Sequence, residues 1–313
     1  MKIIFFGSSH FAVPSLQALI KSKHEVLCVV TRPDKQKGRH LHLAGTGLKE
    51  TAVSVKLKIF QPEDVNSQES LNFLKNLAAD LFVIIAYGQI LSRELLDLPK
   101  IMPINIHASL LPRYRGAAPI NWAVINGEKK SGITIIFVTP KMDSGPVILQ
   151  EEIKIEDKDT AVSLEDKLSL AGAKLLEQAL IKIDNRDYRL VEQDEDEVIF
   201  APKMKKEVGL IDWNGSAADI HNQIRGVLPW PGAFTSLRGK MLKIFQAEIL
   251  LIFPNHRPCT GEVVRADKVG IVVACGRGFL KINELQLEAG KRMSAQNFII
   301  GHKLSIGDIL GKK

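Results

Sequence analysis

The stretch KIIFFGSSHFAVPSLQALI, residues 2–20, decides the fold class. Its apolar run ends at Gly7, two serines follow, and Phe11–Ile20 then has the apolar spacing of an amphipathic helix. Short apolar runs recur at Val26–Val30 and at Leu81–Ala86. Runs of this kind, rich in Val and Ile and separated by helical patterns, predict buried parallel strands of an α/β sheet.

Two further apolar runs and one long helix extend this pattern. Ile104–His107 and Gly132–Val138 are expected to be strands of the same sheet. Ala161–Ile183 carries leucines at positions 164, 168, 175, 176 and 180, close to the spacing of a helix that buries one face. These elements predict a first domain, residues 1–183, that is α/β and Rossmann-like with a mostly parallel sheet.

The first turn lacks the glycines of a dinucleotide site. The G-x-G-x-x-G pattern would need glycine where this chain has Ser9 and Ala12. Serine before a helix commonly caps its first turn, and a helix N-terminus can also hold an anion. We expect capping to be the role of Ser8 or Ser9.

The character of the sequence changes after Asp184. Residues 184–207 are polar and charged with almost no periodicity, which indicates a linker. Beyond it, residues 208–313 contain short strand patterns separated by glycines, at 242–247, 261–264, 270–274 and 279–287. Such a run predicts a small β-barrel domain, for which the OB-fold is a candidate.

Composition excludes several classes of protein. No apolar run approaches the roughly 20 residues that a membrane helix needs, and the first residues read as a strand instead of a secretory signal. Cys28, Cys259 and Cys275 show neither paired spacing nor histidines at ligand intervals. We therefore expect no disulfide framework and no metal site, in a cytoplasmic protein.

Positive charge gathers in two regions. The net charge is +7, and residues 208–313 contain 14 Lys and Arg against 8 Asp and Glu. Residues 31–58 contain seven basic side chains against two acidic ones. Two separate basic regions fit a long polyanion better than one small phosphate. Either region alone is also compatible with an ordinary solvated surface.

Two polar side chains interrupt a predicted buried strand. Asn105 and His107 project from the same face, because side chains alternate along a strand. An amide can donate to a developing oxyanion, and an imidazole can move a proton near neutral pH. The pair either forms part of an active site or closes the strand with hydrogen bonds, and spacing alone leaves both interpretations open.

A carboxylate follows the next strand, in Met142-Asp143-Ser144-Gly145. Asp143 could orient the His107 imidazole, as the third member of many acid–base sets does. The alternative is a turn in which Asp143 bonds its own backbone.

The segment NIHASLLPRYRGAAPI, residues 105–120, resembles the signature of the formyltetrahydrofolate-dependent formyltransferases. The resemblance extends over nearly the whole chain, through AYGQIL, MDSG, IDW, PWPGAF and KRMSAQNF, at residues 86–91, 142–145, 211–213, 229–234 and 291–298. It implies transfer of the formyl group of 10-formyltetrahydrofolate to an amine, without a metal or a covalent intermediate.

The resemblance also assigns residues. The family's catalytic trio falls on Asn105, His107 and Asp143. Its folate-binding segment falls on Ser109, Leu110, Leu111 and Pro112, and its pterin pocket on Tyr87, Gly88, Gln89 and Ile90, largely through backbone groups.

Two features favour the members of the family that formylate methionyl initiator tRNA. Arg39 matches an arginine in their tRNA-binding loop, and Lys35 and Lys37 would add phosphate contacts. The family usually continues this loop with lysines, whereas His40-Leu41-His42 follows here. The second feature is the basic carboxy-terminal domain, similar to the family's OB-fold-like domain. The resemblance implies a monomer with no membrane or DNA partner.

Two other functions stay open at this point. Relatives that formylate nucleotide-linked amino sugars share the same donor site. A non-catalytic RNA-binding protein could also keep the fold, although it would not need the trio of Asn105, His107 and Asp143.

Overall fold

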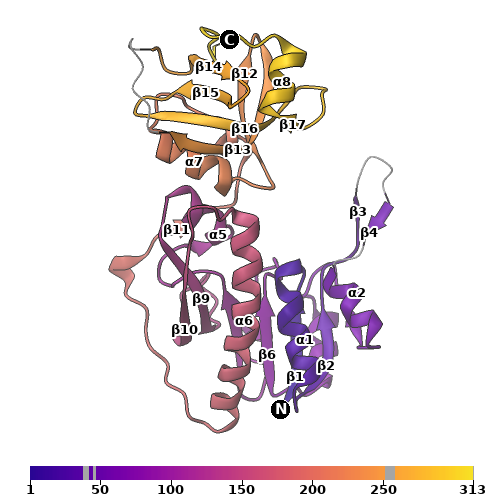
Figure 1. The fold of residues 1–313 in the computed structure, drawn as a ribbon. Coiled ribbons are helices and arrows are strands. Elements are labelled where there is room, and N and C mark those ends of the chain that lie inside the picture. Colours follow the sequence, from indigo (N-terminus) through magenta and orange to yellow (C-terminus); the bar gives the residue numbers. More distant parts are fainter. Residues whose placement is uncertain (38–41, 45–46, 251–257, 313) are drawn as a thin grey trace. The chain divides into compact units, whose positions relative to one another are not determined.

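A computed structural model describes residues 1–37, 42–44, 47–250 and 258–312. The chain divides into two compact units, shown in Figure 1. The first consists of residues 1–119, 130–154 and 165–201, and the second of residues 120–129, 155–164 and 202–313. Residues 120–129 and 155–164, which interrupt the first unit in the sequence, thus belong to the second unit.

The first unit is built on a seven-stranded sheet with the strand order β10-β9-β7-β6-β1-β2-β5. The strands from β7 to β5 in this order run parallel. This arrangement confirms the predicted mostly parallel α/β sheet. Their bounds are β1 (Lys2–Gly7), β2 (Glu25–Val30), β5 (Ile59–Phe60), β6 (Leu81–Ile85), β7 (Met102–His107), β9 (Lys130–Phe137) and β10 (Val147–Lys154).

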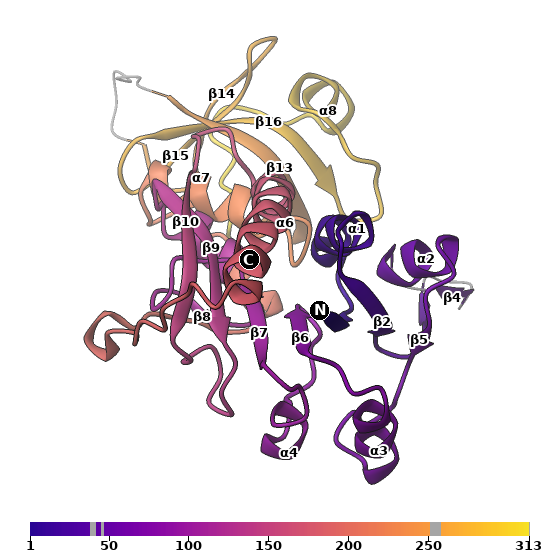
Figure 2. The same cartoon turned by 90° about the horizontal axis from the view of Figure 1, so that it is seen from below.

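Helices cover both faces of this sheet (Figure 2). One face carries α1 (Val13–Lys21) and the long α6 (Ala161–Asp184), and the other carries α3 (Gln68–Asn76) and α4 (Arg93–Leu96). A 3-10 turn, η1 (His10–Ala12), precedes α1. Ser9 Oγ accepts a hydrogen bond of 3.1 Å from the Phe11 amide, which confirms the predicted capping serine. Helix α2 (Gly47–Ser54) lies beside β5.

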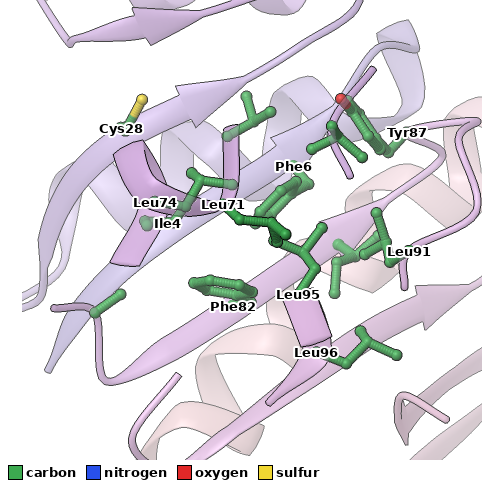
Figure 3. Packing of buried hydrophobic residues seen from close by; sticks show 14 residues of the cluster. Ile4, Phe6, Cys28, Leu71, Leu74, Phe82, Tyr87, Leu91, Leu95 and Leu96 are labelled. Carbon is green, nitrogen blue, oxygen red and sulfur yellow. The ribbon is translucent and has the colours of Figure 1, made fainter. Parts of the chain in front are cut away.

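One hydrophobic cluster fills the space between the sheet and α3 and α4 (Figure 3). Alternate residues of the parallel strands supply it, including Ile4, Phe6 and Phe82, and Leu71 and Leu95 reach it from the helices. Each fully buried side chain of this size contributes about 1.5–3 kcal/mol to folding. The strands that end at the site are therefore firmly fixed.

The direction of strand β9 could not be predicted from the sequence. The run Gly132–Val138 forms a strand of the same sheet as predicted, but within this mostly parallel sheet β9 pairs antiparallel with both β7 and β10. A strand buried on both faces has the same apolar pattern in either direction, so the pattern could not reveal this. The register places Phe137 beside Ile104, so the turn that follows β9 starts beside the beginning of β7.

The segment interpreted as a linker packs closely on the first unit as far as Ala201. Val191 forms two backbone hydrogen bonds with Val147, of 2.7 and 2.9 Å. A 3-10 turn, η2 (Glu195–Glu197), follows, and β11 (Phe200–Ala201) pairs in parallel with β8 (Arg115–Gly116). Residues 191–201 are therefore part of the surroundings of residues 107–116.

The second unit contains an antiparallel sheet with the order β12-β13-β16-β15-β14, and β17 pairs with β16. Its strands are β12 (Ala233–Leu237), β13 (Lys240–Leu250), β14 (Val263–Asp267), β15 (Gly270–Ala274), β16 (Phe279–Leu287) and β17 (Met293–Ser294). The helices of this part are α5 (Pro119–Ile125), η3 (Lys206–Gly209), α7 (Ala217–Gly226) and α8 (Ala295–His302).

The last residues join the two edges of this sheet. Leu310 N donates to Gly261 O beside β14, at 2.8 Å, and Gly311 N donates to Ser236 O of β12, at 2.9 Å. These residues thus bridge the β12 and β14 edges of the antiparallel sheet. No helix among the described residues has both the length and the hydropathy of a membrane span.

A buried arginine explains why residues 155–164 pack with the second unit. Arg225 of α7 is 7% exposed and donates to the carbonyl oxygens of Asp159 at 2.7 Å and Glu156 at 3.3 Å. Asn121 Nδ2 similarly donates to Gly226 O at 2.8 Å. Because a buried guanidinium needs acceptors, the two carbonyls fix residues 155–164 against α7, and the Asn121 amide does the same for residues 120–129.

Candidate active site

The site begins at the end of β7. His107 is the last residue of this strand and is 7% exposed, whereas Asn105 is partly exposed. His107 Nε2 lies 2.9 Å from the carbonyl oxygen of Tyr114, which can only accept, so Nε2 carries a hydrogen. Among the described residues, none forms a hydrogen bond with the Asn105 side chain, which leaves its amide available to a substrate.

Asp143 lies on the other side of the imidazole. Its Oδ2 is 3.6 Å from His107 Nδ1, and the carboxylate is 15% exposed. Oδ2 also accepts a hydrogen bond of 2.9 Å from the Gly116 amide. The structure therefore places the Asp143 carboxylate beside the His107 imidazole. A proton taken up by Nδ1 would face this carboxylate.

The turn that carries Asp143 is conformationally demanding. Asp143 has a φ of +50°, a left-handed conformation that costs a residue with a side chain about 1 kcal/mol. At Gly145, a Cβ atom would lie 1.7 Å from the carbonyl oxygen of Phe137, so only glycine fits. Gln193 Nε2 donates to the carbonyl oxygens of Asp143 at 2.9 Å and Gly145 at 2.7 Å.

The predicted folate-binding segment follows His107 directly. Ser109 and Leu111 are buried, whereas Leu110 and Pro112 are partly exposed. Ser109 Oγ donates to Arg113 O at 2.6 Å. The exposed part of this segment therefore consists of the side chains of Leu110 and Pro112.

Two residues of neighbouring strands brace this segment. Thr134 Oγ1 donates to Ser109 O at 2.6 Å and accepts from Leu111 N at 3.1 Å. Gln150 Nε2 donates to Leu111 O at 3.0 Å and to Thr134 Oγ1 at 2.8 Å. The loop is thus held by side chains of β9 and β10, which the sequence did not single out. Thr134 is the single polar side chain within the apolar run GITIIF, residues 132–137, and this isolated hydroxyl could have indicated a buried hydrogen-bonding role.

The predicted pterin turn follows β6. Tyr87 is 1% exposed and packs edge-on against Phe6, with ring centroids 5.6 Å apart (Figure 3). Its hydroxyl is buried and has no hydrogen-bond partner among the described residues, and burial raises the pKa of Tyr87 to about 12. Gly88 has a φ of +83°, and its carbonyl accepts from the Arg32 guanidinium.

The other two residues of this turn differ in their environment. The Gln89 side chain accepts from Val65 N at 3.0 Å and donates to Glu63 O at 3.2 Å, so its amide is engaged within the protein. Ile90 is 73% exposed, and its carbonyl accepts from Asn66 Nδ2 at 2.9 Å.

The predicted tRNA-binding residues lie in a separate feature. Lys35 and Lys37 are the ends of β3 (Lys35–Lys37), which pairs antiparallel with β4 (His42–Ala44). Arg39 lies outside the described residues. At the base of this hairpin, Lys49 forms an ion pair with Asp34.

Glu195, from the segment 191–201, accepts hydrogen bonds from two basic side chains. Arg115 is 2% exposed, and its Nη2 donates to Glu195 Oε1 at 2.9 Å. Lys141 Nζ donates to Glu195 Oε2 at 3.1 Å. The hydrogen bond from Arg115, followed by that from Lys141, lowers the pKa of Glu195. Within the described residues, no group of three His, Cys, Asp or Glu side chains could hold a metal ion.

Comparison with known families agrees with this arrangement. The Formyl transferase family matches residues 1–180, and the Formyl transferase, C-terminal domain family matches residues 203–303. Among solved structures, WlaRD, a sugar 3N-formyltransferase, has a TM-score of 0.69 at 22% identity, over 90% of this chain and 96% of that one. The N-formyltransferase of Helicobacter canadensis has a TM-score of 0.68 at 19% identity, over 94% and 100%. At these identities the likeness concerns the fold.

Curated relatives are much closer in sequence. The methionyl-tRNA formyltransferase of Acetivibrio thermocellus is 43% identical over 312 residues, which cover all of both chains. That of Caldanaerobacter subterraneus subsp. tengcongensis is 45% identical over 311 residues, covering 99% of this chain and all of that one. The chain therefore belongs to the methionyl-tRNA formyltransferase family.

Proposed function

We propose that this enzyme transfers the formyl group of 10-formyltetrahydrofolate to the free amino group of methionyl initiator tRNA. The product is N-formylmethionyl-tRNA for translation initiation. The observation that carries the proposal is the accessible Asn105 amide next to the pair of buried His107 and partly exposed Asp143, in a chain 43% identical to a methionyl-tRNA formyltransferase over its full length. We expect a monomer that acts in the cytoplasm, where initiator tRNA is used.

The reaction requires an oxyanion to be stabilised and a proton to be moved. The uncharged amine attacks the formyl carbon, and a new C–N bond forms while the carbonyl oxygen becomes an oxyanion. The bond from carbon to N10 of the donor then breaks, and a proton lost by the amine ends on N10. No net oxidation or reduction occurs, so the site has to supply only polar groups and proton transfer.

The three residues divide this work. Asn105 donates its amide N–H to the oxyanion, where a single preorganised donor is worth about 10²–10³ in rate. His107 carries a proton at Nε2. During transfer it can accept a second proton at Nδ1, the nitrogen that lies 3.6 Å from Asp143 Oδ2. Asp143 fixes the ring and stabilises its charged form.

The turn at residues 87–90 and the segment 109–112 fit a folate donor. The Tyr87 hydroxyl is buried without a partner, and a buried polar group of this kind is normally satisfied in the functional state. A pterin offers ring nitrogens, an amino group and a carbonyl as partners. WlaRD was crystallised with 5-N-formyl-THF and the Helicobacter canadensis enzyme with folinic acid, which supports a folate donor in this fold.

The acceptor is inferred from charge. Lys35 and Lys37 lie on the β3–β4 hairpin, and Arg39 belongs to the same segment. Residues 208–313, which include β12 to β17, contain 14 Lys and Arg against 8 Asp and Glu, which is most of the net charge of +7. Such groups bind a phosphate backbone without reading its sequence.

The test is transfer of labelled formyl from 10-formyltetrahydrofolate to several acceptors. We expect rapid transfer to methionyl initiator tRNA and little to elongator methionyl-tRNA, free methionine or an amino-sugar nucleotide. Transfer to the sugar would overturn the acceptor. Binding of tRNA with no transfer would favour an RNA-binding protein.

A pair of asparagine variants tests the site itself. Asn105→Ala should lower kcat by about 10²–10³, whereas the matched variant Asn72→Ala, on the exposed face of α3, should leave it unchanged. A folded Asn105→Ala enzyme with near-normal kcat would contradict the role of Asn105.

A further inference from the structure

We propose that Gln193 is a positioning residue for Asp143, and that buried Arg115 holds Gln193 in place. The inference rests on the proposed catalytic role of Asp143. It assigns a part in the reaction to a segment that the sequence presents as a linker.

The contact with the Asp143 turn is made by one amide group. Gln193 Nε2 donates to Asp143 O at 2.9 Å and to Gly145 O at 2.7 Å, so it spans both ends of the left-handed turn. Register alone would not place this turn at His107, because β9 ends beside Ile104. The turn has to return toward the end of β7, and the Gln193 amide binds it in that position.

The other end of the same amide is held by a charge. Arg115 Nε and Nη2 both donate to Gln193 Oε1, at 3.0 and 2.9 Å. Arg115 is 2% exposed, and its Nη2 also bonds Glu195. A buried guanidinium is costly without hydrogen-bond acceptors, so Arg115 is fixed by the acceptors that it contacts. These acceptors are Gln193 and Glu195 of the segment 191–201.

The backbone fixes this segment at both sides of Gln193. Val191 bonds Val147, four residues after Asp143, and Arg115 N donates to Ile199 O at 2.9 Å. The residue next to Arg115, Gly116, donates its amide to Asp143 Oδ2. Asp143 therefore has two contacts with this part of the protein. Gly116 binds its carboxylate, and Gln193, which is held by Arg115, binds its main-chain carbonyl.

This arrangement requires glutamine in particular. The side chain must donate to two carbonyl oxygens and accept from a guanidinium at the same time, which an amide can do and a carboxylate cannot. Gln193→Glu keeps the size and the contact with Arg115 but removes both donors to the turn. It is therefore the variant that separates positioning from packing.

The experiment is single-turnover and steady-state formylation by Gln193→Glu, with Glu192→Gln as the control on the same segment. Glu192 is exposed. We expect Gln193→Glu to lower kcat by about 10- to 100-fold, since small displacements of a reacting group cost up to this much. KM for donor and tRNA should stay within about twofold, and Glu192→Gln should match the wild type.

A double variant shows whether the effect passes through Asp143. In an Asp143→Asn background, adding Gln193→Glu should change the residual rate by less than about twofold, because the group being positioned is already lost. Exchange of the Gly116 amide hydrogen should also become faster in Gln193→Glu. Should that variant fold poorly, Gln193→Asn, which keeps the amide and loses its reach, should show the same loss of kcat.

Each result is decisive. Wild-type kcat in folded Gln193→Glu, or a full additional loss in the Asp143→Asn background, would overturn the role of Gln193. If Asp143→Asn itself kept normal turnover, the proposed catalytic site would be wrong, and that failure is distinct from a failure of Gln193.

Discussion

The two sides of the candidate site are held by different means. On one side, Asn105 and His107 lie on β7 within the buried sheet, and the loop after them is braced by Thr134 and Gln150. On the other side, Asp143 lies in the turn between β9 and the edge strand β10, and the Gln193 side chain, 50 residues further along the chain, holds this turn. The strand side follows from local pattern, whereas the turn side depends on long-range contacts.

The first prediction concerns the strand side and has the largest effect. His107→Ala should lower kcat by roughly 10²–10⁴, the usual contribution of a proton-transferring group. His302→Ala, in α8 of the second unit, is the control and should leave kcat unchanged. Steady-state formylation measures both, and normal turnover in folded His107→Ala would remove the imidazole from the mechanism.

The second prediction concerns the turn side. In Gly145→Ala the new Cβ would meet the Phe137 carbonyl at 1.7 Å, so the turn must move and take Asp143 with it. We expect kcat to fall by about 100-fold. Gly301→Ala has open space around its Cβ and should have no effect on kcat. Equal kcat values for the two variants would show that the turn tolerates movement.

The third prediction removes a brace of the strand side. Thr134→Val leaves the buried Leu111 amide and Ser109 carbonyl without their partner, which should cost about 1–3 kcal/mol of unfolding free energy. Thr51→Val, which loses one bond within α2, is the comparison. Urea unfolding measures the loss. An equally small change in both variants would contradict the bracing role.

The fourth prediction concerns the donor turn. Tyr87→Phe removes a buried hydroxyl that has no partner, so the free enzyme should gain about 1 kcal/mol of stability. If the hydroxyl bonds the donor, affinity for it should fall several-fold. Tyr188→Phe serves as the control. Calorimetric binding of a folate analogue measures the affinity, and an unchanged value would mean that the donor does not use this hydroxyl.

The fifth prediction has the smallest effect and is a pH dependence on the turn side. The hydrogen bonds from Arg115, and then from Lys141, lower the pKa of Glu195 below its ordinary value of 4.5. The ionised Glu195 carboxylate therefore stabilises the folded protein at pH values above 4.5. This stabilisation is lost as pH falls through the lowered pKa. The Tm of the wild type should therefore slightly exceed that of Glu195→Gln near pH 7, and the two should converge in acid. A Tm gap that persists or grows in acid would contradict this.

The strand side was largely predictable from the sequence. Asn105 and His107 stand out because polar residues two apart interrupt a strand that is otherwise buried, and the structure places that strand inside the sheet. The β15 and β16 strands also have the predicted bounds, because glycines mark their ends.

The turn side was less predictable, for physical reasons. The direction of β9 cannot be read from a run buried on both faces, so neither can the starting point of the Asp143 turn. Gln193 lies in a polar stretch without periodicity, where a residue bonded to the site looks the same as a solvated one. The residues alone left Asp143 open between a site residue and a turn residue, and only the resemblance to a family favoured the site.

The most direct test of the account is single-turnover formylation of methionyl initiator tRNA by Asp143→Asn. This change keeps the size of the side chain and an acceptor for the Gly116 amide, and removes only the negative charge beside His107. The account predicts a rate lower by about 100-fold or more, with tRNA binding retained. A near-normal rate would show that the His107–Asp143 pair is structural.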